Sequence, residues 1–152
     1  MEKKVLYGLS VYDKVMGEIE SILKDSPYSD RHFKKSNNVF DRVKEIIMGQ
    51  SIETKGKVGY FLWRYIRYIH KYWVQVSFEQ KKDVDYTIRV RTKLINKLFE
   101  FCRKNEIDES LESHLANLHN AVWHSLLNQH QFYCKKMNCI DSFYTQFKKY
   151  GN

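Results

Sequence analysis

The fold is decided by residues 57–78, which read KVGYFLWRYIRYIHKYWVQVSF. On a helical wheel of about 100° per residue, apolar side chains at three- and four-residue spacing form one narrow stripe. That stripe consists of Leu62, Ile66, Ile69, Trp73 and Val76. An adjacent aromatic stripe consists of Phe61, Tyr65, Tyr68 and Tyr72. Because such a helix is apolar over most of its girth, we expect neighbouring helices to bury much of it.

Two further helices are expected on the N-terminal side of this segment. The first covers about residues 10–24, with Ser10 as its N-cap, and ends before Pro27. A polar loop follows, and the second helix starts near residues 36–38. The connection to residues 57–78 is expected to be loose, because it contains Gly49, Gly56 and Gly59.

The C-terminal side predicts three more helices. One follows Asp83 and runs to about Lys104, with an apolar set of Val84, Ile88, Ile95, Leu98, Phe99 and Cys102. Asp108 opens the next, whose apolar seam is Leu111, Leu115, Leu118, Val122 and Leu126. The last covers about residues 140–150.

Composition agrees with a helical protein of one domain. The chain has 152 residues, 43% of them hydrophobic, with a single proline and six glycines, whereas an all-β fold needs many turns. We therefore expect an all-α, antiparallel bundle of five to six helices in a single domain. Its core bundle should cover about residues 10–105, with a C-terminal helical extension over residues 106–152.

The positive charge of the chain is localised. The net charge is +8, and residues 57–105 hold twelve Lys and Arg against four Asp and Glu, which accounts for all of it. A concentrated positive field attracts polyanions such as nucleic acid. A basic surface kept for solubility remains an equal alternative.

The cationic side chains fall on defined helical faces. Arg64, Arg67 and Lys71 share one side of the helix at 57–78, whereas Arg89, Lys93 and Lys97 recur every four residues in the next. A short link makes these two helices antiparallel neighbours, so their basic faces can form one ribbon. The candidate phosphate-binding residues are Arg64, Arg67, Lys71, Arg89, Arg91, Lys93 and Lys97.

Three tyrosines are candidates for stacking on bases. Tyr65, Tyr68 and Tyr72 alternate with the cations of residues 63–73, and exposed rings stack on bases. The alternative is that these rings belong to the core or to an interface, with hydroxyls that reach water.

Residues 113–134 contain no Asp, Glu, Lys or Arg, but they include four His, three Asn and two Gln. This composition favours a bundle centre or a subunit interface. The chain can therefore also be interpreted as a protein-interaction module, such as a phage or viral inhibitor or an assembly subunit, that uses this helix or the tyrosine stripe.

The sequence contains few residues in the patterns typical of a catalytic or metal-binding site. Arg64 and His70 match the Arg-His spacing of HEPN ribonucleases, but the wheel separates them by about 120°. His130, Cys134 and Cys139 leave zinc open, although ordinary packing explains them as well. We expect no catalytic residue, no cofactor and no metal, with a HEPN-like ribonuclease as a second alternative.

The chain shows no signal-peptide pattern and no apolar run of transmembrane length. Its three cysteines are most simply reduced thiols, so a cytoplasmic location is expected.

Residues 22–33, which read ILKDSPYSDRHF, resemble a hallmark of a four-helix-bundle family. That family includes the accessory variability determinant of diversity-generating retroelements and the ribosomal intervening-sequence proteins. In it, a proline ends the first helix, and an arginine beside an aromatic residue opens the second. Pro27, Arg31 and Phe33 stand in roughly those places, with His32 inserted.

The resemblance covers about residues 10–105 and rests on these three residues and the order of the helices. It implies a basic, oligomeric bundle that binds nucleic acid and a reverse transcriptase. Together with the charge pattern, it predicts a non-enzymatic accessory protein that binds RNA or DNA within a larger complex.

Overall fold

The computed structural model describes residues 1–24, 30–77 and 84–136, with side chains described for residues 1–24, 38–72 and 88–126. This part of the chain forms five helices and no strand: α1 (Lys3–Lys24), α2 (Asp30–Met48), α3 (Ile52–Ser77), α4 (Val84–Lys104) and α5 (Glu109–Lys136). The all-α bundle expected from the sequence is confirmed. The sixth helix expected at residues 140–150 lies outside the described residues.

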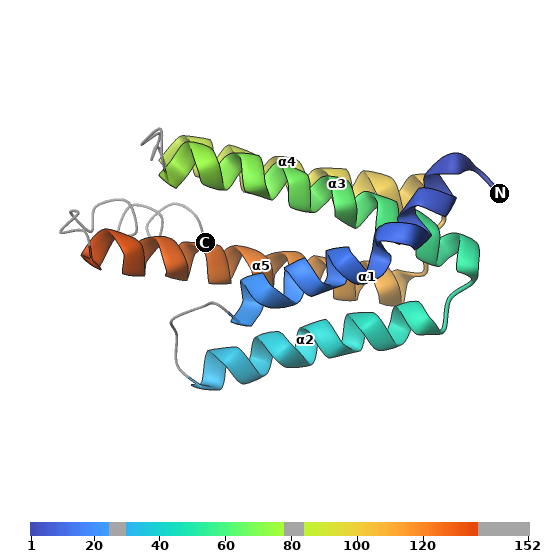
Figure 1. The fold of residues 1–152 in the computed structure, drawn as a ribbon, viewed down its shortest axis with the longest axis horizontal. Coiled ribbons are helices and arrows are strands. Elements are labelled where there is room, and N and C mark those ends of the chain that lie inside the picture. The colour runs from blue at the N-terminus through green and yellow to red at the C-terminus, as the bar shows by residue number, and fades with distance from the viewer. Residues whose placement is uncertain (25–29, 78–83, 137–152) are drawn as a thin grey trace.

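Helix α5 occupies the centre of the bundle (Figure 1). It packs on α1, α2 and α4, and its His119 and Trp123 contact Tyr65 and Tyr72 of α3. All five residues of its predicted seam, Leu111 through Leu126, are buried. The expectation that residues 106–152 extend from a finished core therefore does not hold for α5, because this helix supplies the core's middle.

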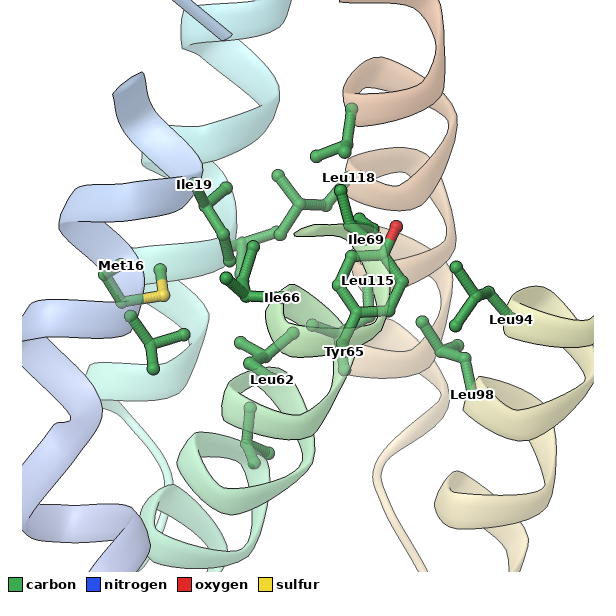
Figure 2. Close-up of a cluster of buried hydrophobic side chains, with 14 of the residues drawn as sticks. Met16, Ile19, Leu62, Tyr65, Ile66, Ile69, Leu94, Leu98, Leu115 and Leu118 are labelled. Atoms are coloured by element: carbon green, nitrogen blue, oxygen red, sulfur yellow. The ribbon is translucent and has the colours of Figure 1, made fainter. Parts of the chain in front are cut away.

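The core forms where α1, α3 and α5 face one another. Met16 and Ile19 of α1 point toward Leu62, Ile66 and Ile69 of α3, and Leu115 and Leu118 of α5 close the far side (Figure 2). Leu62, Ile66 and Ile69 belong to the stripe predicted from residues 57–78, and each is at most 2% exposed. The sequence pattern therefore identified the buried face of α3.

Helix α1 starts earlier than expected. Its buried face begins at Val5 and continues through Gly8, Tyr12 and Val15, so the three- and four-residue spacing runs on before residue 10. Ser10 is not an N-cap, because its hydroxyl donates to the carbonyl of Tyr7 within the helix (2.7 Å).

Helices α2 and α3 also start earlier than expected. The charged residues from Asp30 were expected to form a loop but are helical, consistent with the high helix propensity of Arg and Lys. Helix α3 begins before Lys57, because Ser51 caps it: the Ser51 hydroxyl accepts from the amide of Thr54 (3.1 Å).

Glycines join α1 to α3 instead of separating α2 from α3. Gly56 and Gly59 lie inside α3, buried against Gly8 of α1. A Cβ atom built at Gly8 would overlap the Gly56 carbonyl, and one built at Gly56 would lie 2.5 Å from the carbonyl oxygen of Val5. The absence of side chains lets the two backbones touch, so the expected loose connection was wrong for these two glycines.

The turn from α4 to α5 matches known capping geometry. The amide of Ile107 donates to the carbonyl of Cys102 (2.9 Å), and Glu106 has a φ of 51°, as in a Schellman motif. Asp108 then caps α5 as predicted, since its carboxylate accepts from the amide of Ser110 (3.2 Å).

The buried face of α4 differs from the predicted one. Leu98 and Cys102 are buried as expected, but Val90 and Leu94 complete the face. Ile88 and Ile95 are half-buried, and Phe99 is 37% exposed. The face is therefore rotated from the one first assigned. This rotation sets which cations of α4 reach the surface.

Candidate nucleic-acid interface

Tyr68 marks the place where α3 and α4 meet at the surface. Its half-buried ring lies under two ammonium groups of α4, those of Lys93 and Lys97, each 5.3 Å from the ring centroid. Such cation–π contacts contribute about 0.5–1 kcal/mol at exposed sites. Further along, Phe61 of α3 stacks on Phe101 of α4 at 4.6 Å. Early residues of α3 thus contact late residues of α4, as antiparallel helices require.

A groove follows this seam between α3, α4 and the start of α1. It encloses about 490 Å³ and is floored by apolar and aromatic side chains, among them Phe61, Leu94 and Phe101. Its charged lining is mostly positive: Lys4, Lys57, Arg64, Lys97 and Lys104 against Glu2 and Glu100. We call this feature the α3–α4 groove.

Ion pairing leaves part of this positive charge uncompensated. Lys57 pairs with Glu53 at 3.4 Å and Lys104 with Glu100 at 3.3 Å, both within one helix. Arg64 and Lys97 form no ion pair with the residues that the structure describes. Their charges are therefore available to an anion in the groove.

A second hollow on α4 continues the positive surface. It is shallow and open to solvent, and it is lined by the exposed Arg89, Lys93 and Lys97 together with Glu100 and uncharged neighbours. The prediction that these three cations share one face is confirmed. Since Lys97 lines both hollows, the cations of α4 and Arg64 of α3 belong to one continuous surface.

The remaining α3 cations of the predicted set are exposed, as Arg64 is, but they do not line the groove. The guanidinium of Arg67 lies over the ring of Trp63 in the same helix, 4.8 Å from its centroid. Lys71 is exposed one helical turn after Tyr68, the last residue of α3 that lines the groove. Both remain on the outside of the bundle, where an extended ligand can reach them.

Arg91 is separated from the other cations. It is half-buried on the opposite face of α4 and lies close to His119 of α5, where its charge contributes to the lowered pKa of that histidine. The structure therefore does not bring Arg91 into the surface formed by Arg89, Lys93 and Lys97. Arg91 is two residues from both Arg89 and Lys93, and residues two apart do not share a face of a helix.

Two of the three predicted stacking rings are inside the protein. Tyr65 is 5% exposed and its hydroxyl hydrogen-bonds to Nδ1 of His119 at 2.7 Å. Tyr72 is 3% exposed and packs 4.9 Å from Trp123. Buried rings cannot stack on a base, so this expectation was wrong for Tyr65 and Tyr72. Only Tyr68 remains at the surface.

An exposed aromatic group elsewhere was missed. Tyr7 of α1 meets Trp63 of α3 edge-on at 4.9 Å, and Tyr60 lies 5.7 Å from the same ring. Tyr7 is 43% exposed. Because the first helix was expected to start at about residue 10, Tyr7 was assigned to no helical face and to no neighbour.

The alternative chemistries find no assembled site. His70 is exposed on α3 and does not line the groove that contains Arg64. Within the described residues, no three His, Cys, Asp or Glu side chains gather as metal ligands do. The candidate zinc residues His130, Cys134 and Cys139 lie outside the described side chains.

Fold and site together define an all-helical bundle with a cationic groove between two antiparallel helices. No family model matches the chain, and neither a curated protein nor a solved structure matches it significantly. None of the five described helices has the apolar length that crossing a bilayer requires.

Proposed function

We propose that this chain is a non-enzymatic accessory protein that binds nucleic acid through the α3–α4 groove and the adjoining face of α4. The observation that carries the proposal is that Arg64 of α3 and Lys97 of α4 line one groove with Tyr68, whose ring also contacts Lys93. Phosphate contacts supply most of the affinity of such interfaces, and they need cations free of competing carboxylates. Arg64 and Lys97 meet that condition among the described residues.

Repulsion within α4 favours an anionic partner. Arg89, Lys93 and Lys97 follow one another at four-residue spacing on an exposed face. Like charges so placed destabilise a helix by about 0.2–0.5 kcal/mol per pair. A bound phosphate backbone removes this cost, so the same residues that weaken the free protein strengthen its complex.

The competing protein-interaction function remains a second candidate with less of the surface first assigned to it. The uncharged helix α5 buries its apolar seam in the bundle centre, and Tyr65 and Tyr72 are buried as well. A partner protein would use Tyr68 or the exposed polar side of α5, which includes Asn117 and Asn120. We retain a larger complex as the setting, with a cytoplasmic location and a reverse transcriptase as the protein partner that the family resemblance implies.

A salt titration of the wild-type chain tests the proposal. Labelled single- and double-stranded RNA and DNA of equal length are titrated with protein at about 50 and 200 mM salt. Binding through three or four phosphates predicts that log K falls by about 2–4 per decade of salt, at roughly 0.7–0.9 for each contact. Absent binding, or an affinity that salt does not change, contradicts the proposal.

The same samples decide the ribonuclease alternative. The labelled RNA is run on a denaturing gel after incubation with wild type and with His70→Ala. We expect intact RNA with both proteins. Cleavage by the wild type that disappears in His70→Ala would make the chain a nuclease and contradict its non-enzymatic assignment.

A further inference from the structure

The aromatic cluster of Tyr7, Tyr60 and Trp63 adjoins the α3–α4 groove. Tyr60 lines the groove, and Tyr7 packs against Tyr60 at 6.4 Å and against Trp63 at 4.9 Å. The close approach of α1 to α3 at Gly8 fixes this arrangement, because it places the start of α1 directly on α3. Tyr7 nevertheless keeps 43% of its surface open to solvent.

Cations surround this cluster. The Lys4 ammonium lies 5.8 Å from the Tyr60 centroid, and the Arg67 guanidinium lies 4.8 Å from that of Trp63. Neither forms an ion pair with a carboxylate in the described part of the chain. Lys4 also lines the groove beside Arg64. The two rings that contact Tyr7 therefore each carry a cation, and Lys4 connects this cluster to the α3–α4 groove.

This combination discriminates between anionic partners. An acidic peptide satisfies the cations, but its carboxylates gain nothing from an open aromatic ring. A duplex presents phosphates but keeps its bases paired and stacked inside. A single strand offers both phosphates and unpaired bases, and base–aromatic stacking on such a ring is independent of sequence.

We propose that the preferred ligand is single-stranded nucleic acid, whose phosphates contact Arg64 and Lys97 while an unpaired base stacks on Tyr7. This inference rests on the proposed function and adds the strand state of the ligand to it. It predicts that part of the affinity comes from bases and is independent of salt. The Tyr7 ring, and not its hydroxyl, supplies that part.

The test compares three ligands of equal length: a labelled single strand, the same backbone with abasic sites, and the duplex. Wild type should bind the base-bearing strand about tenfold tighter than the abasic strand. Tyr7→Ala should lose that tenfold on the base-bearing strand only, with an unchanged salt slope. Tyr7→Phe should behave as wild type, and so should Phe99→Ala, which removes an exposed ring of α4 that lines neither hollow.

Each outcome decides the inference. Equal wild-type affinity for the abasic and base-bearing strands overturns the stacking inference but leaves the phosphate interface standing, and this comparison needs no variant to fold. Equal or tighter binding of the duplex has the same consequence. Failure to bind any of the three ligands overturns the proposed function together with the inference.

Discussion

At the scale of single residues, a buried hydrogen bond between Tyr65 and His119 joins α3 to α5 in the core. The phenol oxygen lies 2.7 Å from Nδ1, and His119 is only 2% exposed. Its Nε2 atom has no hydrogen-bond partner among the described residues, and the same holds for Nε1 of Trp123. Buried polar atoms without partners cost stability. Burial also favours the uncharged form of the imidazole.

Burial and the nearby charge of Arg91 lower the pKa of His119 from 6.5 to about 4. Because the unfolded chain binds this proton at higher pH than the folded one, stability is full above about pH 6.5 and falls as the pH drops toward 4. The loss should reach about 2 kcal/mol by about pH 5. Urea unfolding at pH 7 and pH 5, followed by circular dichroism, measures it.

The control for this prediction is His119→Asn, which cannot titrate. Whatever its stability at neutral pH, the variant should lose about 2 kcal/mol less than wild type over the same interval. Equal losses in the two proteins would show that other groups cause the acid sensitivity.

At the scale of helices, the contact of α1 with α3 depends on glycine. Gly56→Ala places a methyl group 2.5 Å from the Val5 carbonyl oxygen and 2.6 Å from its Cγ1 atom. We expect a loss of about 1–3 kcal/mol in the free energy of unfolding, although alanine favours helices. Denaturant unfolding of the variant measures this change.

Gly17 of α1 is the matched control for that variant. It is exposed, and a Cβ atom built there meets nothing within 4 Å. Gly17→Ala should therefore stabilise the protein by about 0.5–1 kcal/mol. Stabilisation by both substitutions would contradict the close contact between α1 and α3.

Periodicity predicted the helices better than their ends or their neighbours. The seams of α3 and α5 were correct because three- and four-residue spacing encodes a buried face directly. Judged from neighbouring residues alone, Gly8, Gly56 and Gly59 indicate a helix break. Only the packing of α1 on α3 shows that these glycines let the two backbones come into contact. For the same reason, the pattern could not show that α5 lies at the centre.

At the scale of the whole molecule, the sequence showed which segment carries the positive charge, but not how its cations are arranged on the surface. The spacing of Arg89, Lys93 and Lys97 fixed their common face, whereas the meeting of that face with Arg64 depends on how α3 and α4 are rotated about their axes. The same rotation turns Arg91 toward His119. Tyr7 joins the surface only through the packing of α1 on α3.

The central claim is that local positive charge in the α3–α4 groove, and not the net charge of the chain, binds nucleic acid. Two double variants separate these possibilities because each removes one arginine and one lysine. Arg64→Ala/Lys97→Ala removes two cations of the groove that form no ion pair among the described residues. Arg42→Ala/Lys44→Ala changes exposed residues of α2, on the opposite side of the bundle (Figure 1).

The decisive measurement is the salt dependence of binding of a labelled single strand to wild type and to both variants. We expect the groove variant to bind more weakly and to reduce the slope of log K against log salt by about 1.4–1.8, because two phosphate contacts are lost. The α2 variant should keep the wild-type slope. Equal reductions in both variants, or a wild-type slope in the groove variant, would contradict the claim.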